Sequence, residues 1–202
     1  PSDFWQGLRR LTRYRYQLSR NLGNEKKRFQ AYAFLKCSDW KRVKAFSVMC
    51  GATSAALLTE FTTSEIQEMT HDQLVDLIRR RGRGRFADPT ATARAVREAL
   101  SSSYPIEDTM DEMVTATLAT IWEHIRFIKR LMKRMDKHIA RYIEPFPNPI
   151  ITVKGLGAVI TAGIQPEIED ISRFAEQNHL AQNMGLTWEN RSSGNSVSNT
   201  PA

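Results

Sequence analysis

Long apolar runs are missing from this sequence. Its apolar runs, such as residues 55–58, are far shorter than the roughly 20 consecutive apolar residues that a membrane-spanning helix needs. No charged segment followed by an apolar one opens the chain, so we expect no secretory leader. The sequence thus predicts a cytoplasmic protein without a membrane partner.

Cysteine and histidine are also scarce. The two cysteines, Cys37 and Cys50, do not have the spacing of metal ligands, and one pair is too few for a disulfide scaffold. The four histidines share no spacing that indicates a metal site or catalysis. We therefore expect reduced thiols, no metal ligands in this chain and no bound cofactor.

Basic residues, in contrast, are abundant and unevenly placed. The chain has a net charge of +7, whereas residues 1–44 alone hold 12 basic and 3 acidic residues, a net +9. Positive charge concentrated on one element attracts polyanions and releases counterions when it binds phosphates. The arginines predicted to contact nucleic acid here are Arg9, Arg10, Arg13 and Arg15. A solvated basic helix face is the alternative.

Apolar spacing predicts two helical stretches in the first third of the chain. Residues 4–36 carry apolar side chains at spacings of three, four or seven, which is typical of a long amphipathic helix. Gly23 and Asn24 are the expected place for a break or kink. A second helix is predicted over residues 41–61.

A short helix is predicted next, beginning at Thr70 or Asp72 and stopping at Gly82. Its end is rich in arginine, and the residues predicted to clamp a phosphate are Arg79, Arg80, Arg81 and Arg83, with Arg85 beyond them. Favourable charge at a helix C-terminus is the alternative. Asp88–Pro89 then indicates another helix start, with its end at residues 101–105.

The most regular pattern is a heptad seam, in which apolar residues recur at alternating spacings of four and three. Its members are Val114, Leu118, Ile121, Ile125, Ile128, Met132, Met135, Ile139 and Tyr142. A helix over about residues 106–144 should pack as a coiled coil, either against a second copy in a homo-oligomer or against the N-terminal helix. Prolines at 145, 147 and 149 then end it and mark a domain boundary.

After the prolines, Gly155 and Gly157 form a predicted turn before an apolar run, and a second turn is predicted at Gln165–Pro166. A glycine turn that opens a helix exposes unpaired backbone N–H groups, which suit a phosphate. Helix-hairpin-helix DNA binders use this arrangement, so Lys154, Gly155 and Gly157 are predicted to contact nucleic acid. An ordinary turn is the alternative.

Three motifs follow one another in register near the end of the chain. They are Val153-Lys154-Gly155-Leu156-Gly157, Glu169-Asp170-Ile171-Ser172-Arg173-Phe174, and Gly185-Leu186-Thr187 followed by Arg191-Ser192-Ser193-Gly194. In order and spacing they resemble the insertion-sequence 110/116/902 transposase family, which includes the Piv-type DNA invertases. Lys154 and Trp188 stand where that family usually has proline.

The resemblance implies part of a bacterial two-part recombinase. In this family a RuvC-like domain with four acidic residues holds divalent metal, expected to be Mg²⁺ in the full-length parent. A C-terminal domain supplies a serine that attacks the DNA phosphate and becomes linked to it. By its place before Gly194, that serine maps onto Ser193, with Ser192 and Ser196 as neighbouring alternatives. A structured noncoding guide RNA is a further implied partner.

We therefore predict an all-α chain with a helical linker and coiled-coil region over residues 1–148 and a small, incomplete transposase domain over residues 149–202. The chain is expected to be a fragment that binds DNA and RNA without cutting, because no RuvC-like acidic domain is identifiable in it. The alternatives are a non-catalytic helix-hairpin-helix-like nucleic-acid-binding module and a coiled-coil interaction protein.

Overall fold

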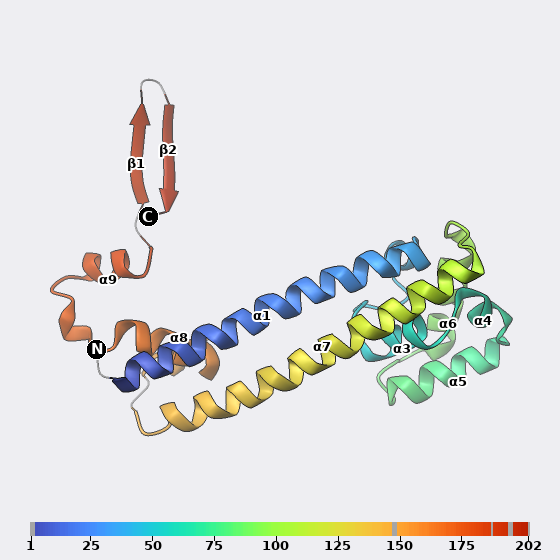
Figure 1. Ribbon diagram of the computed structural model, residues 1–202, viewed down its shortest axis with the longest axis horizontal. Helices are drawn as coiled ribbons and strands as arrows, with labels where there is room; N and C mark the ends of the chain where they lie inside the picture. Colours follow the sequence, from blue (N-terminus) through green and yellow to red (C-terminus); the bar gives the residue numbers. More distant parts are fainter. Residues whose placement is uncertain (1–2, 147–148, 187, 194–195, 202) are drawn as a thin grey trace. The chain divides into compact units, whose positions relative to one another are not determined.

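The computed structural model describes residues 3–146, 149–186, 188–193 and 196–201, without the side chains of residues 149, 151 and 188–201. The chain divides into two units, which we call unit 1 (Pro1–Arg15 with Met135–Ala202) and unit 2 (Tyr16–Arg134). Helices make up most of both units, which confirms the predicted all-α class (Figure 1). No described helix is long and apolar enough to cross a membrane.

The first helix, α1, runs from Asp3 to Lys36 without interruption. The break expected at Gly23 and Asn24 is therefore wrong, and a kink there stays a prediction. A Cβ atom built on Gly23 would meet no other atom within 4 Å, so packing does not require glycine there. Burial of the apolar stripe, with Leu18 and Phe29 nearly inaccessible, offsets the modest helix-breaking tendency of one glycine.

The heptad seam lies on α7, which spans Asp108–Ile143. Within unit 2 its members Val114, Leu118 and Ile125 are buried in the same core as Phe29 of α1. The ring of Phe29 lies 5.9 Å from that of Trp122, which places the two helices side by side (Figure 1). Here the seam packs against the N-terminal helix, one of its two predicted partners. Assembly into a homo-oligomer stays a prediction.

The helix predicted over residues 41–61 is wrong, because two shorter ones replace it. These are α2 (Trp40–Val43) and α3 (Ala52–Glu60). Lys44 ends α2 in the left-handed region with φ of 55°, a conformation that no glycine signalled in the sequence. A further short helix, α4 (Thr63–Glu68), was not predicted, although a capping box of Thr62 and Glu65 begins it.

The two helices predicted from their caps are confirmed. Helix α5 spans His71–Gly82, and the side chain of its N-cap Thr70 accepts from the backbone of Gln73. Helix α6 spans Pro89–Ser102 and begins at Asp88, whose side chain accepts from the backbone of Ala91. Both helices pack into the core of unit 2 through buried apolar residues.

Unit 1 contains short elements after α7. They are the 3-10 helix η1 (Pro149–Thr152), α8 (Ala158–Ile168), the 3-10 helix η2 (Ile171–Arg173), α9 (Gln177–Asn183) and the antiparallel strands β1 (Trp188–Ser193) and β2 (Ser196–Pro201). The turn predicted at Gln165–Pro166 is wrong, because α8 continues through both residues. Pro166 removes only one N–H near the helix end, and the N–H of Glu169 still bonds the carbonyl of Gln165 at 2.8 Å. The β-hairpin was not predicted.

Candidate nucleic-acid interface

The glycine turn is present and leads directly into α8. Gly155 has φ of +95°, in the region that favours glycine, and Gly157 is the N-cap of α8 without a side chain to bond the first amides. N–H groups in the first turn of a helix lack an intrahelical acceptor. This end of α8, with the exposed Lys154 nearby in sequence, therefore offers donors and positive charge to an anion.

The element before the turn is shorter than the first α-helix of a helix-hairpin-helix motif. It is η1, a 3-10 helix of four residues, in place of an α-helix. The similarity to that motif is thus confined to the turn and α8.

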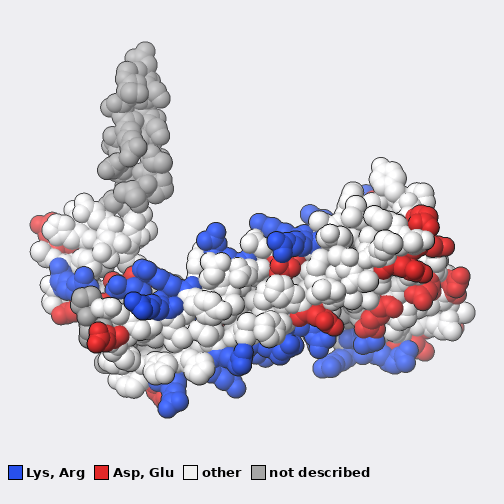
Figure 2. All heavy atoms as spheres, in the orientation of Figure 1, with Lys and Arg blue, Asp and Glu red and all other residues white. Residues whose placement is uncertain are grey.

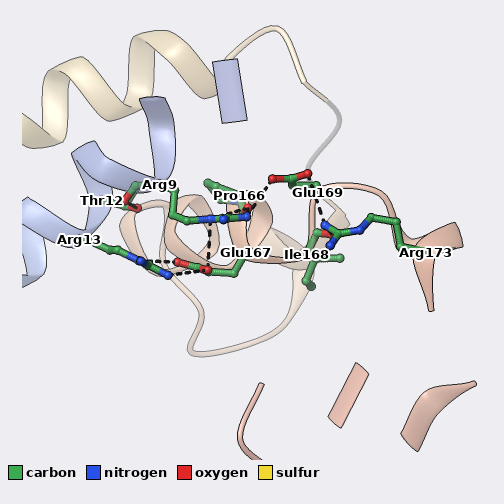
Figure 3. Close-up of polar contacts among 8 residues, drawn as sticks. All are labelled: Arg9, Thr12, Arg13, Pro166, Glu167, Ile168, Glu169 and Arg173. Atoms are coloured by element: carbon green, nitrogen blue, oxygen red, sulfur yellow. Dashed lines mark hydrogen bonds and ion pairs between the residues drawn. The ribbon is translucent and has the colours of Figure 1, made fainter. Parts of the chain in front are cut away.

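The C-terminal end of α8 is held by arginines of α1 (Figure 3). Arg9 donates through Nη2 to the carbonyl oxygen of Pro166 and to Oε1 of Glu169, both at 2.8 Å. Arg13 binds both carboxylate oxygens of Glu167, at 2.9 and 3.0 Å. A guanidinium is favourable here because a helix C-terminus carries negative partial charge. Arg9 and Arg13 therefore contact the end of α8 opposite the glycine turn.

The other two arginines predicted on α1 differ from each other. Nε of Arg15 lies 2.8 Å from Oδ1 of Asp136 on α7, and both side chains are partly buried. Arg10 is exposed, and no described contact joins it to a carboxylate. Of the four predicted arginines, Arg10 is thus the one without a described carboxylate partner.

The motif from Glu169 to Phe174 is bonded largely to itself. The carboxylate of Asp170 accepts from the backbone N–H of Ser172 at 2.9 Å and from its hydroxyl at 2.7 Å. These hydrogen bonds from Ser172 hold the pKa of Asp170 below its ordinary value. Nη1 of Arg173 lies 3.3 Å from Oε2 of Glu169. The polar residues of this motif therefore fix the chain after α8 and leave few groups for chemistry.

Ser193 is the last residue of β1 and pairs with Ser196 across the hairpin. Gly194 and Asn195, which join the strands, lie outside the described residues. The side chains of Ser192, Ser193 and Ser196 also lie outside them. The role of Ser193 as a nucleophile stays a prediction.

The arginines predicted at the end of α5 lie in unit 2. Arg79 is paired with Asp76 at 2.7 Å and Arg81 with Glu60. Arg83 is exposed and forms the C-cap of α5 with φ of 50°. The structure thus distributes the predicted site residues over two units: Lys154, Gly155 and Gly157 lie at the start of α8 in unit 1, and Arg80, Arg81 and Arg83 line one groove in unit 2.

Acidic and thiol side chains are not gathered as metal ligands would be. In the described part of the chain, no three His, Cys, Asp or Glu residues form a group that could hold a metal ion. We therefore assign no step through a metal to these residues.

Residues 148–201 match the family described as Transposase IS116/IS110/IS902. The predicted resemblance is confirmed for this segment. This transposase segment includes the glycine turn, α8, η2, α9 and the β-hairpin. Searches of curated proteins and of solved structures each found no match.

Two sets of polar residues were missed by the sequence analysis. Glu167 and Glu169 bind α1, but no local pattern reveals a partner more than 150 positions away. Arg126 and Lys129 line a groove in unit 2, together with Trp122. Their spacings of four and three put these three residues on one face of α7, so a search for basic helix faces would have found them.

Proposed function

We propose that the transposase segment acts on DNA and supplies the nucleophile for strand exchange, and that the chain binds DNA and a structured RNA. The observation that carries this proposal is the family match over residues 148–201. The motif register supports Ser193 as the nucleophile, because Ser193 directly precedes Gly194.

In the proposed step, Oγ of Ser193 forms a bond to a DNA phosphorus, and the bond from that phosphorus to one deoxyribose oxygen breaks. The deoxyribose oxygen takes up a proton, and a base removes the hydroxyl proton of the serine. An unassisted serine alcohol is a poor nucleophile. The family's acidic, metal-holding domain is the expected source of that assistance.

The start of α8 supports phosphate binding by the same segment. Gly155 allows the turn, Gly157 leaves the first amides of α8 without a side-chain cap, and Lys154 adds charge. A phosphate at this position would accept from backbone N–H groups and lie at the positive end of the helix dipole.

The chemical part of the proposal is tested by trapping. In a protein that joins this chain to a RuvC-like domain, Ser193→Ala should abolish strand exchange and leave DNA binding intact, because no charge changes. Ser192→Ala and Ser196→Ala are the matched controls and should remain active. Mass spectrometry of the trapped complex should find DNA linked to Ser193. An adduct at Ser192 or Ser196 would move the site, and an active Ser193→Ala protein would leave a non-catalytic binding module.

The binding part is tested with the chain alone. Lys154→Gln should weaken duplex DNA binding and lower the magnitude of the log–log salt slope by about 0.9, the value for one lost phosphate contact. Lys137→Gln removes the same charge from an exposed position on α7 and should have less effect. Equal effects of the two variants would contradict a phosphate site at the start of α8.

A further inference from the structure

We propose that a basic groove in unit 2 binds the phosphate backbone of a nucleic acid, at a site distinct from the glycine turn of α8. The groove has a volume of about 700 Å³ and lies between α3, the end of α5 and the middle of α7. The basic residues lining it are Arg80, Arg81, Arg83, Arg85, Arg126 and Lys129. Figure 2 shows Lys and Arg side chains gathered along the lower edge of unit 2, where α5 and α7 lie.

Most of this positive charge is not neutralised within the chain. Glu60 is the one acidic residue lining the groove, and Arg81 is paired with it. In the described part of the chain, Arg83, Arg85 and Arg126 form no ion pair with a carboxylate, nor does Lys129. These cations repel one another, so an anion in the groove would relieve an unfavourable interaction that the fold retains.

The loop that carries two of the arginines is anchored to the core. Its chain reverses through left-handed Arg83 and Gly84, and the N–H of Arg85 bonds the carbonyl of Gly82 at 3.1 Å. Phe86 then packs so closely on Gly82 that a Cβ at Gly82 would meet its ring at 2.3 Å. Arg83 and Arg85 therefore extend from a fixed backbone, which lowers the entropy lost on binding.

The opposite wall of the groove is also ordered. Nζ of Lys129 lies 5.4 Å from the centroid of the Trp122 ring, within the range of a cation–π contact. Trp122 is in turn packed against Phe29 of the core. Arg126 lies one turn after Trp122 on the same face of α7.

Unpaired cations spread over two elements fit a ligand with repeated negative charges better than a single carboxylate. A phosphodiester backbone has such charges at regular intervals, and Arg and Lys supply many of the contacts that proteins make to it. The groove therefore suits backbone phosphates without base recognition. Either DNA or RNA can supply them.

The test compares two double variants of the whole chain that lose equal charge. Arg85→Gln with Arg126→Gln alters the groove, whereas Lys41→Gln with Arg94→Gln alters exposed positions of unit 2 outside it. Binding to a short DNA duplex and to an RNA hairpin is measured by fluorescence anisotropy over a salt series. For the duplex, the groove variant should lower the magnitude of the log–log salt slope by about 1.8, two contacts at about 0.9 each. The control should keep most of the wild-type slope.

Equal slopes for the two double variants would overturn the proposal. A smaller salt slope of the groove variant with both the duplex and the hairpin means that the groove binds either backbone. A smaller slope with one of them assigns the groove to that nucleic acid. The single variant Arg126→Gln should lower the salt slope by about half as much, and it keeps the test valid if the double variant misfolds. Thermal melting checks that each protein is folded. Wild-type binding without salt dependence would contradict nucleic-acid binding as a whole, whereas salt-dependent wild-type binding with an inert groove would overturn the groove alone.

Discussion

Nζ of Lys36 lies 3.3 Å from Oδ1 of Asp111, and both side chains are buried. Lys36 also donates to the carbonyl oxygens of Leu58 and Phe61, and Asp111 accepts from the backbone N–H of Thr63. The pair thus joins the end of α1 to the start of α7 and to the chain around α3 and α4. Burial lowers the pKa of Lys36, and the negative charge of Asp111 opposes that shift.

Lys36→Met should destabilise the protein strongly, because it leaves Asp111 buried without its cation. We expect a loss of about 3–5 kcal/mol in the free energy of unfolding, measured by urea denaturation. Lys41→Met, at an exposed position, should change stability by less than about 0.5 kcal/mol. The double variant Lys36→Met/Asp111→Asn should lose less than the sum of its single variants. Additive losses would contradict the coupling.

The same lysine gives a pH dependence. Its pKa is lowered in the folded protein, so between that value and the ordinary one of 10.5 the unfolded chain binds more protons than the folded chain. Stability should therefore rise with pH across this window, by at most about 1.4 kcal/mol per pH unit. At each pH, the unfolding free energy of Lys36→Met is subtracted from that of the wild-type protein. The difference removes the contributions of the titrating groups that behave alike in the two proteins. A difference that stays flat or falls as pH rises through the window would refute the assigned direction.

Gly82→Ala should destabilise unit 2, because the added methyl group would overlap the ring of Phe86. Overpacking of this kind costs about 1–3 kcal/mol. Gly23→Ala is the control, since a Cβ there meets no other atom within 4 Å and alanine favours a helix. Chemical denaturation should show the first variant weakened and the second unchanged or strengthened. The reverse order would show that the packing of Phe86 on Gly82 is wrong.

Ile125→Asn tests the seam of α7. Ile125 is fully buried, so the side-chain amide of asparagine would lose its hydration without gaining a hydrogen-bond partner. We expect a loss of about 3 kcal/mol or more in the free energy of unfolding. Phe127 is two residues away and 47% exposed, which makes Phe127→Asn the matched control. Thermal melting that is equally affected by both changes would mean that the seam is not selectively buried.

Arg9 and Arg13 should contribute unequally to the docking of α8. The side chain of Arg9 is 24% exposed and that of Arg13 is 67% exposed, so solvent screens the second pair more. We expect Arg9→Gln to cost about 1–2 kcal/mol and Arg13→Gln less than about 0.5 kcal/mol. Hydrogen exchange of the α8 amides would measure both, and faster exchange in Arg13→Gln than in Arg9→Gln would reverse the assignment.

Local signals in the sequence predicted much of the helical fold. Thr70 and Asp88 are N-caps whose side chains bond the adjacent backbone, and such bonds depend on neighbours in sequence alone. Heptad spacing likewise predicted α7 and a buried face that includes Val114, Leu118 and Ile125, whereas Tyr142 at the end of the seam is 48% exposed. The split between α2 and α3 was missed because α2 ends at Lys44, whose left-handed conformation no glycine signals in the sequence.

The candidate site was less predictable than the fold. Arginine spacing on α1 indicated a basic surface, but Arg9 and Arg13 have glutamate partners that follow from the fold and not from any local pattern. The β-hairpin has one local signal in the sequence, because Gly194–Asn195 is a two-residue sequence typical of tight hairpin turns. Its polar strands lack the alternating apolar residues that predict a strand.

Unit 1 is assembled from two stretches of chain, Pro1–Arg15 and Met135–Ala202, so the residues that hold the end of α8 are encoded far from it. Genetic exchange of the transposase segment alone would bring Glu167 and Glu169 into a different protein. The residues at positions 9 and 13 of that protein would have evolved beside other side chains at the end of α8. We therefore expect the two stretches to be inherited together. Substitutions at the arginine and glutamate positions should be correlated across related genes, with a charge lost on one side accompanied by a charge lost on the other.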